Sequence, residues 1–188
     1  MTVTAVPALA DPEIAAAVFA DHVARVSGGA QARERGWAFT WLDAMHVVVT
    51  VTGTRPDGQR DGYHLKLGAE YYDRYPPTTS FVCPPRPATG SAPGRDGWTE
   101  APAGSRWLPA VTPLPWFAIH SGYGNFADGV ARQLVCCSMT FEYYITGHGP
   151  TAGQQWRQGR HTLAATLNRV HDALNSPNYQ GPAGADDP

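Results

Sequence analysis

Three stretches between residues 37 and 67 alternate apolar and polar side chains and are separated by turns. They cover residues 37–41, the β-branched run 47–52, and residues 63–67. Alternation with a period of two is typical of half-buried strands, and β-branched and aromatic residues favour them. Residues 55–58, Arg-Pro-Asp-Gly, form a turn between the second and third stretches. The sequence therefore predicts an antiparallel meander.

Helices are expected near both ends of the chain. Asp11 is a predicted N-cap, Pro12 suits the first helical position, and Gly28-Gly29 ends this first helix. A second helix is predicted from about residue 160 to 175. The apolar faces are Ile14, Val18, Phe19, Val23 and Val26 in the first helix, and Leu163, Leu167, Val170 and Leu174 in the second.

The rest of the chain is predicted as one domain over residues 11–179. A fourth strand is expected at about residues 79–83, and the Pro- and Gly-rich region that follows reads as a long insertion at about 84–115. Extended segments are expected at 116–120 and 133–135. The ends, residues 1–10 and 180–188, are expected to be a flexible and a disordered tail.

Charge and composition exclude several functions. The net charge is −2 with no basic block, which gives no electrostatic support for binding nucleic acid or a membrane surface. No apolar run approaches the length of a membrane span, and we see no signal-peptide pattern. Three cysteines are too few for a disulfide scaffold, so a cytoplasmic protein with reduced thiols is expected. Lys66 is the only lysine, which codon bias in a GC-rich genome explains better than avoidance of self-modification.

Two of the three cysteines are adjacent, at the end of the strand 133–135. A thiol at a strand end can be exposed and act as a nucleophile. Side chains alternate along an extended chain, so only one of Cys136 and Cys137 can face a cleft. Cys136 is the candidate nucleophile and Cys137 the alternative; the other reading is that both are buried packing residues.

The order of these features resembles the ubiquitin-conjugating enzyme family over roughly residues 11–180. Tyr75-Pro76-Pro77, followed by Phe81, is similar to the family's Tyr-Pro signature, and Val135-Cys136 is similar to its catalytic cysteine site. Trp156 and the helix that begins near His161-Thr162-Leu163 and leads to Ser176-Pro177-Asn178 follow in the family's order. The family's His-Pro-Asn motif is absent, with His120 and Asn125 as its nearest counterpart, and the gap from cysteine to tryptophan is longer. These departures suggest a divergent, prokaryotic type, from a bacterial ubiquitin-like conjugation system.

The resemblance implies an α+β fold of ubiquitin-conjugating type and a transferase. Such an enzyme accepts a ubiquitin-like protein from an adenylating activating enzyme as a cysteine thioester. It then passes this protein to an amine, that of a lysine, on a protein target. It needs no cofactor or metal of its own. The implied site comprises Cys136 as nucleophile, Asn125 as oxyanion donor, His120 as loop-ordering residue, and His148 for proton transfer or pKa tuning, with Tyr123, Asp128, Tyr143 and Tyr144 lining the substrate approach.

Each of these residues has a plainer reading. Asn125 suits a turn between Gly124 and Phe126, His120 and His148 can be structural or solvated, and the tyrosines can be core residues. Two further hypotheses stay open: a non-catalytic relative that binds a ubiquitin-like protein, and a cysteine hydrolase. A zinc site is disfavoured, because adjacent cysteines lack the usual two-residue spacing of zinc ligands.

Overall fold

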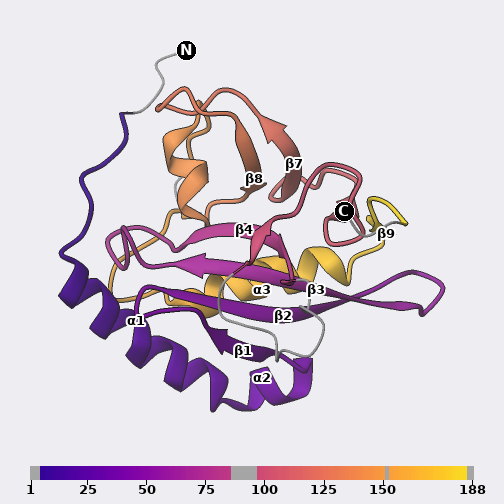
Figure 1. Ribbon diagram of the computed structural model, residues 1–188, viewed down its shortest axis with the longest axis horizontal. Helices are drawn as coiled ribbons and strands as arrows, with labels where there is room; N and C mark the ends of the chain where they lie inside the picture. The colour runs from indigo at the N-terminus through magenta and orange to yellow at the C-terminus, as the bar shows by residue number, and fades with distance from the viewer. Residues whose placement is uncertain (1–4, 86–96, 151–152, 186–188) are drawn as a thin grey trace.

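The computed structural model of the chain describes residues 5–85, 97–150 and 153–185, and it shows a mixed α+β protein built on an antiparallel sheet. Five strands lie in sequence order, each antiparallel to the next (Figure 1). The predicted meander is thus confirmed, with a fifth, two-residue strand added. The strands are β1 (Ala38–Trp41), β2 (His46–Thr54), β3 (Arg60–Gly68), β4 (Thr78–Cys83) and β5 (Thr99–Glu100).

Helix α1 (Pro12–Ser27) begins where the sequence predicts. The Asp11 carboxylate accepts the N–H groups of Glu13 and Ile14, at 3.0 and 3.1 Å. Helix α3 (Leu163–Leu174) is capped in the same way by Thr162. A short helix α2 (Ala30–Arg35), which was not expected, follows α1 directly. Ile14 is 66% exposed, so its assignment to the buried face of α1 was wrong.

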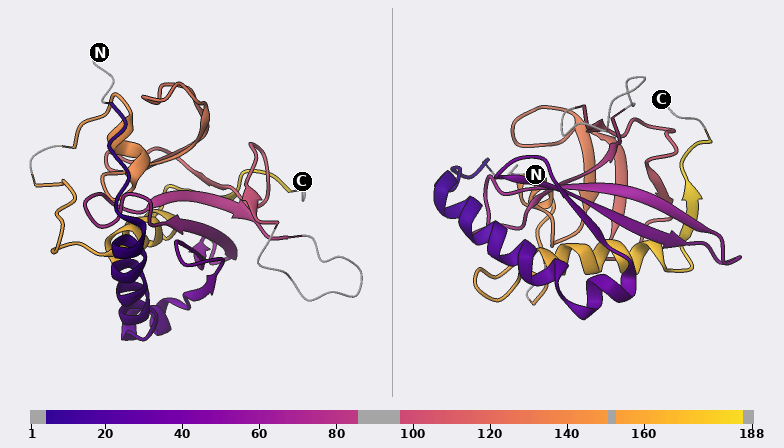
Figure 2. Two further views of the ribbon diagram at one scale, coloured as in Figure 1. Left: turned by 60° about the vertical axis from the view of Figure 1, so that its left-hand side comes forward. Right: turned by 60° about the horizontal axis from the view of Figure 1, so that its bottom comes forward.

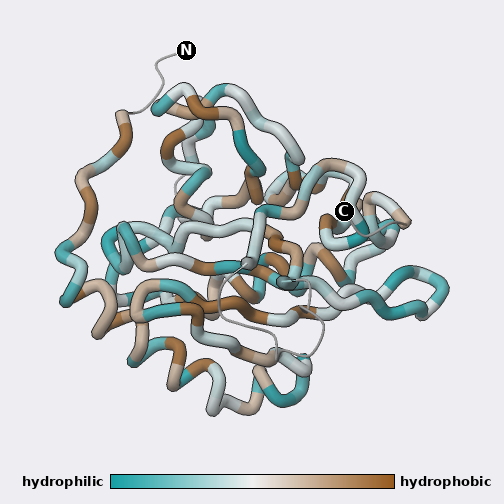
Figure 3. Tube along the Cα trace, viewed as in Figure 1, coloured by the Kyte–Doolittle hydropathy of each residue, from teal (hydrophilic) through white to brown (hydrophobic). Residues whose placement is uncertain are grey.

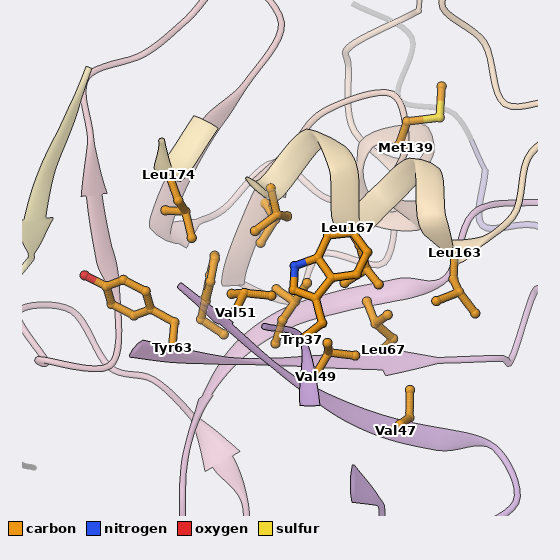
Figure 4. Packing of buried hydrophobic residues seen from close by; sticks show 14 of the residues in the cluster. Trp37, Val47, Val49, Val51, Tyr63, Leu67, Met139, Leu163, Leu167 and Leu174 are labelled. Carbon is orange, nitrogen blue, oxygen red and sulfur yellow. The ribbon is translucent and has the colours of Figure 1, made fainter. Parts of the chain in front are cut away.

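The helices α1 and α3 cover one face of the sheet and enclose the main core (Figure 2). The inward side chains of β2 and β3 meet α3 there, and Trp37 packs among them (Figure 4). Each fully buried aliphatic or aromatic side chain contributes on the order of 1.5–3 kcal/mol relative to an exposed one. The central members are Val47, Val49, Val51, Tyr63, Leu65, Leu67, Leu163, Leu167 and Leu174, all fully buried.

A second, smaller layer stands beyond β4 (Figure 1). Strands β7 (Ala118–Tyr123) and β8 (Arg132–Cys136) form an antiparallel hairpin, and the 3-10 helix η1 (Phe141–Ile145) follows β8. Strand β6 (Pro109–Val111) pairs with β9 (Tyr179–Pro182). The prediction of a disordered tail from residue 180 was therefore wrong at residues 180–182, because β6 gives them a backbone partner. Of the expected 84–115 insertion, residues 86–96 lie outside the described residues, and β5 and β6 belong to the remainder.

Two buried side chains join this layer to the edge of the sheet. The carboxamide of Gln133 accepts the N–H of Phe81 at 2.6 Å and donates to the carbonyls of Phe81 and Ala101, both at 3.2 Å. The carboxylate of Glu142 accepts the N–H of Thr79. Buried backbone N–H groups require acceptors. Strand β5 pairs only with Val82 and Cys83, the last two residues of β4. Gln133 and Glu142 thus satisfy the open edge of β4 and fix the position of β8 and η1.

Among the described residues, no helix has the length and apolar character needed to cross a membrane.

Candidate functional site

A cavity of about 250 Å³ lies where β8 ends. Its walls come from the start of β7, the end of β8, η1 and the loop after η1. Residues predicted for the site from four separate places in the sequence gather around it: His120, the pair Cys136 and Cys137, Tyr143 and His148. Trp116 and Gln154, which the sequence did not single out, complete the polar and aromatic lining.

The two thiols differ in their surroundings. Cys136, the last residue of β8, pairs with Ala118 and is half-buried, whereas Cys137 is 2% exposed and belongs to the main core. Burial raises the pKa of the Cys136 thiol to about 11 and that of Cys137 to about 12. Among the described residues, Cys136 has no hydrogen-bond or ion-pair partner that would favour the thiolate. Cys136 is therefore the more accessible thiol, and it is protonated at neutral pH in the free protein.

The backbone around Cys136 is held by Thr140, a fully buried residue. Its hydroxyl donates to the carbonyls of Val135, at 2.6 Å, and Cys137, at 2.9 Å. Its own N–H donates to the Cys137 carbonyl at 3.1 Å. These bonds close the turn after β8 and hold the carbonyls of Val135 and Cys137, the two residues that flank Cys136. This role could not be predicted, because no sequence pattern distinguishes Thr140 from other threonines that follow a strand.

Two imidazoles face the cavity from different elements. The His148 ring stacks on Tyr143 with centroids 5.6 Å apart and planes at 17°, and its Nδ1 is 2.9 Å from the hydroxyl of Thr146. Tyr123 contacts both imidazoles, with its ring centroid 5.4 Å from that of His120 and 5.9 Å from that of His148. Burial, and secondarily the nearby His148, lower the pKa of His120. His120 is thus neutral at pH 7 and can accept a proton.

Asn125 and Asp128 do not line the cavity. The hairpin register pairs Ala118 with Cys136 but Tyr123 with Arg132, so the β7–β8 turn lies at the other end of the hairpin. Asp128 instead forms an ion pair with Arg132 at 2.9 Å. The structure therefore does not bring Asn125, the predicted oxyanion donor, or Asp128, predicted to line the substrate approach, to the cavity beside Cys136.

Tyr144 and Trp156 have structural roles. The Tyr144 hydroxyl donates to the Ser138 carbonyl at 2.9 Å and accepts the N–H of Trp156 at 2.7 Å. The indole N–H of Trp156 donates to the Asp73 carbonyl at 2.7 Å. These bonds join the segment before α3 to the turn before β4. Tyr144 is thus a framework residue, unlike its neighbour Tyr143.

No group of three or more His, Cys, Asp or Glu side chains in the described part of the chain is placed to hold a metal ion. No family model, curated protein or solved structure matches the chain. The site itself combines a half-buried thiol at a cavity wall, a neutral imidazole, a second imidazole stacked on a tyrosine, and a hydrogen-bonded turn after the thiol.

Proposed function

We propose that this chain is a carrier of ubiquitin-conjugating type, with Cys136 as its nucleophile. The Cys136 sulfur attacks the thioester that joins a ubiquitin-like protein to its activating enzyme. A new C–S bond forms, the old one breaks, and the thiol proton passes to the departing sulfur. An amine of the protein target then attacks the new thioester, forming a C–N bond and returning a proton to Cys136. The ATP is used by the activating partner.

The observation that carries this proposal is the environment of the Cys136 thiol. A thiol with a pKa of about 11 is a poor leaving group compared with one of low pKa, so a thioester on it reacts slowly with water and with any amine that is not held in position. A thiol that holds an acyl group until a target arrives benefits from that property. Because a cavity of about 250 Å³ adjoins the sulfur, there is room for an acyl carbonyl and an approaching amine.

The arrangement of the elements also supports the proposal. An N-terminal helix precedes an antiparallel meander, the cysteine follows at the end of a later strand, and a helix packs on the sheet near the C-terminus. The extra helix α2, the fifth strand and the hairpin β7–β8 depart from the expected pattern of one helix, four strands and one helix. The assignment to the ubiquitin-conjugating type therefore remains part of the proposal.

A charging assay tests the proposal. The protein is mixed with ATP, an active activating enzyme and its ubiquitin-like protein, and the products are separated on reducing and non-reducing gels. An adduct that a thiol reductant removes, present with Cys137→Ala and absent with Cys136→Ala, supports the carrier role. If no adduct forms while the activating enzyme charges itself, the carrier proposal fails.

The surroundings of Cys136 and Cys137 also favour a second candidate function, a non-catalytic module that binds a ubiquitin-like protein. The raised pKa of both thiols fits cysteines that only pack. Native maleimide labelling separates the two candidates, because Cys83 and Cys137 are buried and only Cys136 is half-exposed. Labelling at Cys136 alone supports the carrier; no labelling at any cysteine supports the module.

A cysteine hydrolase has less support. Such enzymes need a thiolate activated by a positioned base, and among the described residues neither His120 nor His148 is hydrogen-bonded to Cys136. Turnover of peptide or ester substrates without ATP would favour the hydrolase over both other candidates.

A further inference from the structure

A second cavity, of about 150 Å³, lies at the edge of β4, where the sheet meets β8 and η1. We call it the β4-edge cavity. No described residue lines both this cavity and the one beside Cys136. Its lining is polar throughout, and the ionisable members are His46, Lys66, Glu70, Glu100, Arg132 and Glu142. A cavity with this many charged groups is suited to a polar ligand rather than an apolar one.

The floor of the β4-edge cavity is the face of the sheet opposite the helices. Leu65 and Leu67 point into the main core, so Lys66 between them points to the other face. The alternation of hydrophobic and hydrophilic positions along β3 is visible in Figure 3. Ser80 of β4 is the register partner of Lys66. The ammonium group and the hydroxyl group therefore lie side by side on the cavity floor.

Lys66 is the cation of this cavity that has no partner. It is half-buried, and no described residue forms an ion pair or hydrogen bond with it. By contrast, His46 lies 2.7 Å from Glu70, and Arg132 lies 2.9 Å from Asp128. Lys66 is also the only lysine among 14 basic residues. Because codon bias favours arginine elsewhere in the chain, a lysine here indicates a need for a compact ammonium, which fits a small cavity better than a planar guanidinium.

Two further groups offer hydrogen-bond donors to the same space. Glu142 is 8% exposed, and burial raises its pKa to about 8, so it carries a proton at neutral pH. Its carboxyl group accepts the N–H of Thr79, but its own O–H has no acceptor among the described residues. The hydroxyl of Ser80 likewise forms no hydrogen bond within the described structure. Since buried polar groups are rarely left unpaired, an acceptor from outside the chain fits here.

The ionised carboxylates of the cavity already have donors. Glu70 has one oxygen 2.7 Å from Nε2 of His46, and its other oxygen accepts the hydroxyl of Thr78 at 2.9 Å. Glu100 accepts the N–H of Gln133 at 3.0 Å. The unsatisfied groups are therefore mainly donors, which favours an anionic ligand. Because like charges repel, these two carboxylates also favour a ligand with a single negative charge.

We propose that the β4-edge cavity binds a small organic carboxylate, with the Lys66 ammonium, the Ser80 hydroxyl and the Glu142 acid group as donors to its oxygens. Charge-assisted hydrogen bonds are the stronger kind, so Lys66 supplies most of the affinity. A cavity of about 150 Å³ holds a ligand of about six non-hydrogen atoms, the size of benzene or lactate. Cys136 and its proposed function play no part in this binding.

The test is a titration of the isotope-labelled full chain with sodium lactate, followed by NMR of the backbone amides. The amide signals of Thr79 and Ser80 should shift and saturate with lactate, and should not do so with sodium chloride at the same ionic strength. Lys66→Gln should weaken lactate binding by roughly tenfold or more, and Ser80→Ala by a smaller factor. The matched control is Arg60→Gln, at the exposed start of β3, which should bind as the wild type does.

Three results would overturn the proposal. The first is a wild-type chain whose amide signals do not shift in a saturable way with lactate. The second is binding that neither Lys66→Gln nor Ser80→Ala weakens, because the ligand would then lie elsewhere. The third is tighter binding of inorganic phosphate than of lactate, which would exclude a carboxylate as the preferred ligand. Unchanged signals from α3 show that Lys66→Gln is folded; if they change, Ser80→Ala decides.

Discussion

Both carboxylate oxygens of Glu142 lie within hydrogen-bonding distance of the Thr79 amide nitrogen, at 3.0 and 3.1 Å. Glu142 belongs to η1 and Thr79 to β4, so this contact joins the segment after the cysteines to the edge of the sheet. The next residue of η1, Tyr143, lines the cavity beside Cys136. The position of the cavity wall therefore depends on a buried acidic side chain 63 residues away from its partner in the sequence.

Glu142 should make the stability of the protein depend on pH. Burial raises its pKa from 4.5 to about 8, although the Thr79 N–H opposes this. Between these values the folded chain holds a proton that the unfolded chain has lost. The contribution of Glu142 is therefore fully present below pH 4.5 and is lost as pH rises through about 8, by at most about 1.4 kcal/mol per pH unit.

Glu142→Gln removes this titration while keeping an acceptor for Thr79. Urea unfolding at several pH values from 5 to 8 should give a flatter dependence of the free energy of unfolding in this variant than in the wild type. Glu34→Gln, at an exposed position of α2, is the control and should keep the wild-type slope. Equal slopes in the wild type and Glu142→Gln would show that Glu142 is ionised in the folded protein.

Gln133→Leu should destabilise the fold. The substitution removes three hydrogen bonds and leaves the buried N–H of Phe81 without its acceptor. An unsatisfied buried group costs about 1–3 kcal/mol, so we expect a loss of roughly 2–3 kcal/mol in the free energy of unfolding. Gln59→Leu, in the exposed turn after β2, should change it by less than about 0.5 kcal/mol. A loss in Gln133→Leu no larger than in this control would contradict the role assigned to Gln133.

Thr140→Val keeps the shape of the side chain but removes the hydroxyl that donates to Val135 and Cys137. The turn after β8 should loosen, and the buried Cys137 should become reactive toward maleimide in the native state. We expect a loss of about 1–2 kcal/mol in stability from the lost hydroxyl hydrogen bonds, because both carbonyls keep a backbone N–H donor. Mass spectrometry of the labelled protein locates the modified cysteine. Thr40→Val, on the exposed face of β1, is the control; protection of Cys137 in both variants would refute the prediction.

The reactivity of Cys136 should rise steeply with pH. Only the thiolate reacts, and the pKa of this thiol is about 11, so the alkylation rate should increase about tenfold per pH unit from pH 7 to 9. Cys136→Ala gives the background rate. A plateau reached near pH 8 would show that some group stabilises the thiolate, and would favour the hydrolase.

The parts of the fold that were predicted from sequence depend on local patterns. The strands β2 and β3 were predicted from the alternation of apolar and polar residues, and the helix α3 from apolar residues three or four positions apart. Both patterns can be recognised within a few consecutive residues. The strand β9 was missed because its Gly- and Pro-containing sequence looks like a tail, and its partner β6 lies about 70 residues earlier. Ile14 was misplaced because the buried stripe of α1 runs through Ala15, Phe19 and Val23, and Ile14 lies beside this stripe.

Part of the candidate site could also be predicted from local features of the sequence. Cysteine, histidine and tyrosine have reactive side chains and are therefore candidates in any sequence. The structure brings four of them to one cavity: His120, Cys136, Tyr143 and His148. Asn125 was chosen as the nearest counterpart of the family's His-Pro-Asn motif, but the hairpin register places it at the end opposite Cys136. Gln133 and Glu142 carry no local signal, because their partners are backbone groups of a distant strand.

The turn between β7 and β8 has a practical consequence. It lies at the opposite end of the hairpin from Cys136, and its residues Gly124, Asn125, Asp128 and Gly129 are exposed. Exposed turns of this kind tolerate inserted residues. A fluorophore or a short epitope attached there would travel with the hairpin and report on its motion, while leaving the thiol free to react.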